Sequence, residues 1–176
     1  DFKMHKFSKP IISILDGIVM GGGAGLMFGS SYKISTERTR FAMPEIGVGL
    51  FPDVGFTSII KTLPKGLGLY MMLTSTQLTA SDTVFCDLTN ASINSNDIDR
   101  LLIDVTKQIW HDEPEENIDI IDSLVKNNSY TDKIKELPES KIMKEIDKIQ
   151  SLTDEQELSK VCSNILSNQT DDDWYL

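Results

Sequence analysis

The chain has 176 residues, of which 40% are hydrophobic and 25% are charged, proportions that are ordinary for a globular protein. Its net charge of −10 excludes a broad basic surface for nucleic acid or an anionic membrane, and no apolar run reaches the roughly 18 residues of a membrane-spanning helix. Two cysteines and two histidines are too few for a disulfide scaffold or a multi-histidine metal site, so we expect no bound metal.

Charge and glycine content divide the chain near residues 92–96. Residues 1–92 carry a net charge of +1 and contain all eleven glycines, whereas residues 93–176 carry −11 and contain none. We therefore expect an α/β core over the first part, followed by an acidic, all-helical region over the second.

The first part alternates short apolar runs with turn residues, which predicts strands and helices in a layered α/β fold. A buried strand is predicted at residues 10–15 and is extended by residues 18–20, and a helix follows the glycine cluster through residues 26–28. Two more strands and one more helix are predicted at residues 32–35, 40–43 and 67–74.

The second part carries apolar residues at spacings of three or four, which predicts amphipathic helices with charged outer faces. The three predicted faces consist of Ile98, Leu101, Leu102, Val105 and Ile109, then Ile118, Ile121, Leu124 and Val125, then Ile142, Ile146 and Ile149. Plausible N-cap residues are Asn94 or Ser95, Ser140 and Asp154.

Residues 21–25 include four glycines between an apolar strand and a helix. Backbone N–H groups in such a turn can hold a phosphate or stabilise an oxyanion, because glycine allows a ligand to approach closely. The alternative is tight helix–strand packing or a plain sharp turn. A dinucleotide-binding G-x-G-x-x-G pattern fails, because Phe28 stands where the third glycine is needed.

Two carboxylates, Glu45 and Asp53, lie in an otherwise apolar segment rich in glycine and proline, residues 43–55. Carboxylates in such surroundings can act as general acids or bases. The alternative is that either one caps a turn or a helix, and Asp53 could be the N-cap of a helix over residues 55–62.

Two segments resemble the signature of the enoyl-CoA hydratase/isomerase (crotonase) superfamily. Residues 9–26 read KPIISILDGIVMGGGAGL, and residues 41–55 read FAMPEIGVGLFPDVG. The second segment is similar to the 3-hydroxyisobutyryl-CoA hydrolase branch, and the sequence LTASD at residues 78–82 matches the superfamily's continuation. The resemblance spans residues 9–92, about half the chain.

This resemblance implies a crotonase-like β/β/α superhelix, here partial, followed by helices. It assigns an oxyanion-binding N–H to Gly22, with Gly21 and Gly23 as structural neighbours. The family's second oxyanion donor comes from an upstream Ala-Gly turn that this sequence does not contain. We therefore expect the chain to be truncated at both ends and to be inactive or weak by itself.

The resemblance also implies the chemistry. Hydratases of the family carry a catalytic Glu where Gly25 stands here, whereas the hydrolase branch pairs the positions of Glu45 and Asp53. The implied activity is hydrolysis of 3-hydroxyisobutyryl-CoA in valine breakdown, with Glu45 as nucleophile or general base. Asp53 would orient the substrate's 3-hydroxyl group or a water molecule. CoA enters as part of the substrate, and no separate cofactor is expected.

The expected partner is an acyl-CoA, and neither nucleic acid nor a membrane is expected. The resemblance implies mitochondrial localisation and self-association into a homo-oligomer. Two alternatives remain open. One is another crotonase activity, hydratase or isomerase, and the other is a non-enzymatic subunit of the mitochondrial ribosome, since similar proteins occur there.

Overall fold

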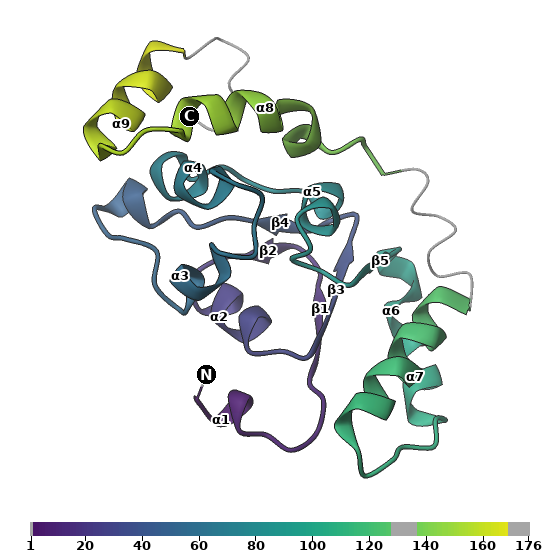
Figure 1. Ribbon diagram of the computed structural model, residues 1–176. Coiled ribbons are helices and arrows are strands. Elements are labelled where there is room, and N and C mark those ends of the chain that lie inside the picture. The colour runs from purple at the N-terminus through teal and green to yellow at the C-terminus, as the bar shows by residue number, and fades with distance from the viewer. Residues whose placement is uncertain (1, 128–136, 169–176) are drawn as a thin grey trace.

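The computed structural model describes residues 2–127 and 137–168. In these residues, two sheets, each made of parallel strands, form the centre, and helices pack around them (Figure 1). The strands are β1 (Ile12–Leu15), β2 (Ile18–Val19), β3 (Tyr32–Thr36), β4 (Arg40–Phe41) and β5 (Ala91–Ile93). The α-helices are α1 (Phe2–His5), α2 (Gly22–Phe28), α3 (Phe56–Ile59), α4 (Leu67–Thr74), α5 (Ala80–Phe85), α6 (Ile98–Thr106), α7 (Pro114–Asn127), α8 (Lys141–Thr153) and α9 (Leu158–Ser167). Two short 3-10 helices are η1 (Glu45–Val48) and η2 (Ser95–Asp97).

The strands alternate between the two sheets along the chain. β1, β3 and β5 form one sheet, in which Ile34 of β3 pairs with Ile14 on one side and Ala91 on the other. β2 and β4 form the second sheet. The prediction that residues 18–20 extend the first strand is therefore wrong, because they begin a strand of the other sheet. Gly17 turns the chain between the two sheets with a φ of +109°, a conformation that other residues rarely adopt.

The helix that follows the glycine cluster begins earlier than predicted. α2 begins at Gly22 rather than at Leu26, and Gly21, with a φ of +50°, is its N-cap. The carbonyl oxygen of Gly21 accepts the Gly25 N–H at 3.1 Å. The glycine cluster therefore forms the first turn of the helix. The helix predicted at residues 67–74 is confirmed as α4.

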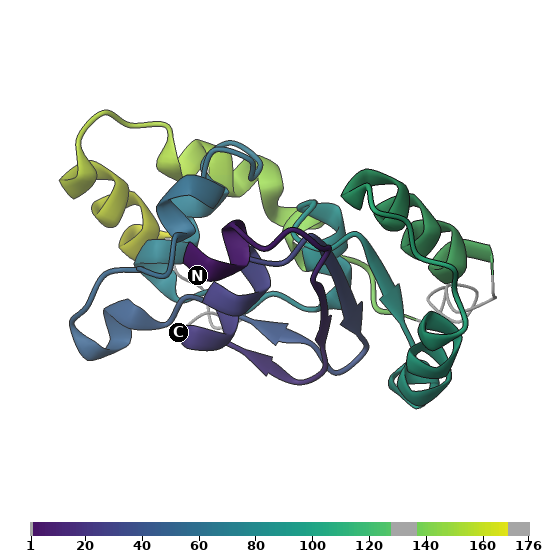
Figure 2. The same cartoon turned by 90° about the horizontal axis from the view of Figure 1, so that it is seen from below.

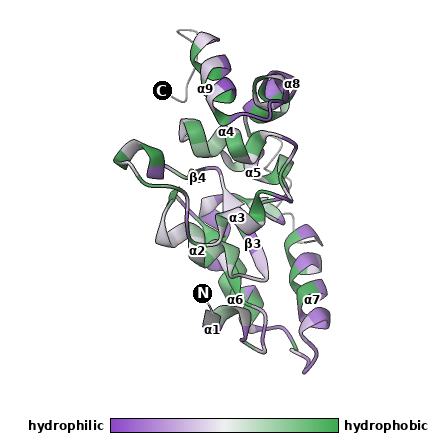
Figure 3. Cartoon of the chain, turned by 60° about the vertical axis from the view of Figure 1, so that its left-hand side comes forward, coloured by the Kyte–Doolittle hydropathy of each residue, from purple (hydrophilic) through white to green (hydrophobic). Residues whose placement is uncertain are grey.

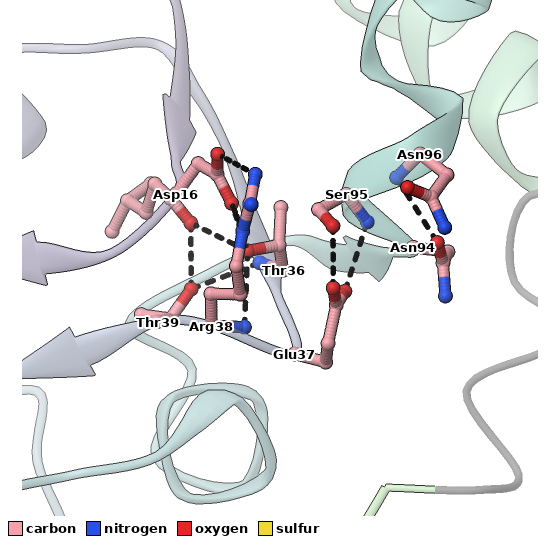
Figure 4. A network of polar contacts seen from close by, with 9 residues as sticks. Asp16, Thr36, Glu37, Arg38, Thr39, Asn94, Ser95 and Asn96 are labelled. Atoms are coloured by element: carbon pink, nitrogen blue, oxygen red, sulfur yellow. Dashed lines mark hydrogen bonds and ion pairs between the residues drawn. The ribbon is translucent and has the colours of Figure 1, made fainter.

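Polar side chains hold the turn after β3 against the turns after β1 and β5 (Figure 4). The Arg38 Nε donates to Asp16 Oδ1 at 2.7 Å, and the Thr36 hydroxyl donates to the same oxygen at 2.8 Å. The hydrogen bond from Arg38 lowers the pKa of Asp16. Glu37 accepts hydrogen bonds from the hydroxyl and the backbone N–H of Ser95. These contacts fix the carboxyl edge of the three-stranded sheet.

Two hydrophobic clusters form the core, and side chains from before and after residue 92 contribute to both. The first cluster lies between the sheets, α2, α4 and the pair α8–α9, and includes Val19, Met27, Phe41, Phe56, Met71, Ile142, Ile149 and Val161. The second lies where α6 and α7 cover β3 and β5, and includes Tyr32, Ile34, Ile93, Leu101, Ile121 and Val125. Figures 1 and 2 show the two helical pairs on different sides of the sheets. The division of the chain near residue 92 stays a prediction.

The three amphipathic helices predicted for the second part are confirmed as α6, α7 and α8, and α9 follows them. Figure 3 shows apolar and polar bands on the same helices, most clearly on α7. Leu102 and Ile109 are 50% and 81% exposed, so their assignment to the buried face is wrong. Ile109 lies beyond the end of α6. None of the helices within the described ranges is long and apolar enough to span a bilayer.

Two of the predicted N-caps are confirmed. The side chains of Asn94 and Ser140 accept backbone N–H groups two and three residues later, at 3.0 and 2.9 Å. The prediction that Asp154 is an N-cap residue is wrong, because α9 begins only at Leu158, with Glu157 as its N-cap residue. Asp154 instead follows the end of α8 and forms an ion pair with Lys65 at 2.7 Å.

Candidate active site

Two neighbouring parallel strands end side by side where predicted site residues lie. Val19 of β2 pairs with Phe41 of β4, and the Ala42 N–H donates to the Val19 oxygen at 3.3 Å. Gly22 follows Val19 by three residues, and Glu45 follows Phe41 by four. Because the strands run in the same direction, both positions lie at the carboxyl edge of this sheet. The structure therefore brings the glycine turn and Glu45 to one edge.

The glycine turn is open on its outer side. A Cβ atom added to Gly22 or Gly23 would meet no neighbouring atom within 4 Å, and both residues are exposed. Tight helix–strand packing therefore does not explain these two glycines, whereas the φ of +50° does explain Gly21. Among the described residues, the Gly22 N–H has no hydrogen-bond acceptor, while the Gly23 N–H donates to the Met20 oxygen at 3.0 Å. The Gly22 N–H is thus free to bind an oxygen of a ligand.

Glu45 begins the 3-10 helix η1, which packs against α4. Its Oε2 atom is buried and has no hydrogen-bond partner among the described residues. The side chain does not cap η1, whose N-cap residue is Pro44 and shows no side-chain cap. The Glu45 carbonyl oxygen accepts the Leu50 N–H at 2.9 Å, which fixes the backbone. A buried carboxylate oxygen without a partner is costly, so its retention needs an explanation, and a substrate or water would provide the missing partner.

Asp53 lies in the loop between η1 and α3, and it is exposed. α3 begins at Phe56 with Gly55 as its N-cap residue, and no side chain caps it. The alternative that Asp53 is a helix N-cap is therefore wrong. Its carbonyl oxygen accepts the Phe56 N–H at 2.8 Å. No hydrogen bond joins the carboxylates of Asp53 and Glu45 within the described ranges.

An aromatic cluster ties together the three segments that carry the predicted site residues. Phe28 of α2 contacts Phe41 edge-to-face, with ring centroids 6.0 Å apart. It also contacts Phe56 of α3, with centroids 6.1 Å apart. α2 begins at Gly22, β4 leads into the segment of the first carboxylate, and α3 follows the second. The cluster therefore fixes the relative positions of these segments, because packed aromatic rings resist displacement.

The segment between the two carboxylates exposes apolar side chains. Val48 and Phe51 are each 74% exposed, and Leu50 is 64% exposed. Exposed apolar side chains offer surface that can bind another apolar group. These three lie within six residues after Glu45 along the chain.

A cavity of about 280 Å³ lies elsewhere, between the start of β1 and the helices α6 and α7. Its lining residues are Lys9, Pro10, Ile12, Val105, Trp110, His111, Asn117 and Ile121. None of the predicted site residues lines it. Within the two described ranges, no group of three or more His, Cys, Asp or Glu side chains could hold a metal ion.

Sequence reasoning missed two residues beside the predicted site. Phe28 contacts the rings of Phe41 and Phe56, which are 13 and 28 residues away in the chain, and no local sequence pattern predicts such contacts. Val54 has a φ of +46°, which a β-branched residue rarely adopts, and only the glycine that follows it hints at a sharp turn there.

Comparison with known proteins shows what the chain is similar to. A family model described as enoyl-CoA hydratase/isomerase matches residues 1–176. The chain is 41% identical over 107 residues to the probable 3-hydroxyisobutyryl-CoA hydrolase 3 of Arabidopsis thaliana, which covers 61% of this chain and 28% of that protein. It is 34% identical over 160 residues to the mitochondrial 3-hydroxyisobutyryl-CoA hydrolase of Xenopus tropicalis, which covers 90% of this chain and 40% of that protein.

The small ribosomal subunit protein mS47 of Neurospora crassa is also similar, with 38% identity over 95 residues, or 54% of this chain and 19% of that protein. The chain thus spans less than half the length of each of these relatives. Among solved structures, a carnitinyl-CoA dehydratase from Mycobacterium thermoresistibile superposes with a TM-score of 0.76 and 24% identity, over 96% of this chain and 45% of that one. This likeness shows the fold, and the crotonase-like architecture predicted from the sequence is confirmed.

Proposed function

The chain belongs to the enoyl-CoA hydratase/isomerase (crotonase) family, and from this premise we propose that the protein hydrolyses the thioester of 3-hydroxyisobutyryl-CoA. The observation that carries the proposal is the buried Oε2 of Glu45, which has no hydrogen-bond partner among the described residues, at the sheet edge that Glu45 shares with Gly22. Water cleaves the C–S bond and gives 3-hydroxyisobutyrate and free CoA, a step of valine breakdown. CoA is the substrate's own group, and the proposed reaction needs no other cofactor and no metal.

Attack on a thioester places negative charge on the carbonyl oxygen. The free N–H of Gly22 donates a hydrogen bond to that oxyanion, and Gly21 and Gly23 hold the turn that presents it. Each such donor contributes about 3–4 kcal/mol in comparable sites.

Glu45 acts on the thioester in one of two ways. As a nucleophile, its carboxylate attacks the carbonyl carbon, the CoA thiolate leaves, and water then cleaves the mixed anhydride and restores the carboxylate. As a general base, it takes a proton from water, the resulting hydroxide attacks, and the departing thiolate takes up the proton. A single turnover in ¹⁸O-labelled water tests the nucleophilic route, because label enters the Glu45 carboxylate only when water attacks the anhydride at the Glu45 carbonyl carbon.

Asp53 and the exposed apolar segment serve the acyl group. The Asp53 carboxylate accepts the substrate's 3-hydroxyl group or orients the water, and its exposure leaves it accessible to both. Val48 and Phe51 offer apolar surface to the methyl-bearing acyl chain or to the pantetheine arm. We further propose a mitochondrial location, as the Xenopus relative's name states for that protein, and self-association into a homo-oligomer.

Two other functions compete with this proposal. A hydratase activity is disfavoured, because Gly25 stands where hydratases of the family carry a catalytic Glu, and a double-bond isomerase activity stays an alternative. A structural role in the mitochondrial ribosome is supported by the similarity to mS47, although the retained carboxylates at residues 45 and 53 favour an enzyme.

The test is an assay of the intact protein with 3-hydroxyisobutyryl-CoA, isobutyryl-CoA and crotonyl-CoA. We expect thiol release that is fastest with 3-hydroxyisobutyryl-CoA and no hydration of crotonyl-CoA. Hydration without thiol release would establish the hydratase alternative. No reaction with any thioester, together with co-sedimentation with the small mitochondrial ribosomal subunit, would establish the structural alternative.

A further inference from the structure

We propose that Val54 is a positioning residue that holds the Asp53 carboxylate in place for the hydrolysis, an inference that rests on the proposed function. Val54 has a φ of +46°. This left-handed region is unfavourable for a β-branched side chain, because its Cβ substituents crowd the backbone. Strained residues of this kind gather at functional sites, and Val54 directly follows a proposed catalytic residue.

The surroundings of Val54 explain how the strained conformation persists. Its side chain packs against the first hydrophobic cluster. Pro52 and Phe56 on either side are buried, and the Phe56 ring is anchored by Phe28. Gly55 is left-handed as well, with a φ of +87°, so the chain reverses between Asp53 and α3. Packing on both sides therefore fixes this turn.

The anchored turn restricts the backbone of Asp53. Its carbonyl oxygen is bound to the Phe56 N–H at 2.8 Å, and its side chain is exposed between anchored neighbours. The backbone of Asp53 cannot rotate freely unless Val54 leaves the cluster. Because α3 packs against α2, which begins at Gly22, the same anchoring sets Asp53 relative to the glycine turn.

The test compares Val54→Gly with Val54→Ile in the intact protein. Glycine accepts the left-handed conformation but removes the anchor, so we expect a thermal midpoint close to that of the wild type. We expect kcat for 3-hydroxyisobutyryl-CoA to fall about 10- to 100-fold with KM unchanged, since a loosened catalytic group loses its orientation. Val54→Ile keeps the branched anchor and should retain kcat, as should Thr57→Ala, an exposed control on α3.

A double-mutant cycle with Asp53→Asn shows whether Val54 acts through Asp53. We expect Val54→Gly to cause no further loss once Asp53 is replaced. An unchanged kcat in Val54→Gly, or an equal loss in both backgrounds, overturns the proposal.

Amide hydrogen exchange separates this proposal from the proposed function. If the intact protein hydrolyses no acyl-CoA, the proposed function fails, and exchange at Phe56 still reports on the anchor. Val54→Gly should speed exchange of the Phe56 amide by about tenfold or more while the Gly29 amide of α2 stays unchanged. Unchanged exchange at Phe56 overturns the anchoring role of Val54.

Discussion

Asp82 accepts a hydrogen bond from the hydroxyl group of Ser140 at 2.7 Å, although the two residues are 58 positions apart in the chain. The same fully buried carboxylate accepts the N–H of Ile142 at 3.0 Å, and the N–H and hydroxyl of Thr79 at 2.9 and 2.7 Å. One side chain therefore satisfies donors at the beginnings of both α5 and α8. It binds the acidic helical region to the glycine-rich part of the chain.

Replacing Asp82 with Ala should destabilise the protein by about 2–4 kcal/mol, because several buried donors lose their acceptor. Urea unfolding measures this loss. Asp87→Asn removes an exposed carboxylate just after α5 and should change the free energy of unfolding by less than about 0.5 kcal/mol. Equal effects of the two substitutions would show that the hydrogen bonds of Asp82 to α5 and α8 contribute nothing to the stability of the protein.

Gly66 should not tolerate a side chain. A Cβ atom there would lie 2.1 Å from the Thr153 hydroxyl oxygen of α8, and the residue has a φ of +80°. Gly66→Ala should therefore cost about 2–4 kcal/mol by separating α4 from α8. Gly47→Ala is the control for unfolding experiments, because a Cβ there meets no atom within 4 Å. A Gly66→Ala protein as stable as the control would contradict this close approach.

Tyr32 should make stability sensitive to alkali. Its hydroxyl donates to Asp122 Oδ1 at 2.8 Å, and burial, with this hydrogen bond to a carboxylate, raises the pKa of Tyr32. The folded state thus favours the neutral phenol, so Tyr32 contributes stability below the ordinary tyrosine pKa of about 10, and that contribution is lost as pH rises above it. Between about pH 8 and about pH 11, the free energy of unfolding should fall more for the wild type than for Tyr32→Phe. Identical slopes would contradict the assignment.

Elements with a strong local signal were predictable, and those that depend on distant partners were not. The helix at residues 67–74 follows a glycine and has an apolar composition that indicates its limits. β2 has two residues, too few for any periodicity, so its separation from β1 into another sheet appears only through pairing with β4. β5 has only three residues and was not predicted, since only its place beside β3 makes it a strand.

The candidate site divides in the same way. Gly22 and Glu45 are predicted as site residues because each lies in a short motif of unusual composition, and their roles stay predictions. Their meeting at one sheet edge follows from a strand pairing that residue patterns do not encode. Phe28, Asp82 and Val54 were not predicted to matter, because their significance arises from packing and backbone conformation rather than from residue type.

Asp53→Asn should affect substrates selectively. If the carboxylate accepts the 3-hydroxyl group, its replacement should lower kcat/KM for 3-hydroxyisobutyryl-CoA about 10- to 100-fold, the range for loss of a hydrogen bond to a charged group. The loss should be much smaller for isobutyryl-CoA, which lacks that hydroxyl. Equal losses for the two thioesters would show that Asp53 does not recognise the 3-hydroxyl group, and its proposed role would then be to orient the water molecule.

The most direct measurement is the turnover of 3-hydroxyisobutyryl-CoA by an intact Glu45→Gln protein. Glutamine keeps the shape of the side chain but cannot attack the thioester or take a proton from water. We expect kcat to fall at least about 100-fold, with a circular dichroism spectrum and unfolding midpoint like those of the wild type. Glu155→Gln, an exposed replacement between α8 and α9, should keep full turnover. A folded Glu45→Gln protein with undiminished kcat would contradict the central claim that the Glu45 carboxylate, at the sheet edge that also carries the glycine turn, performs the reaction.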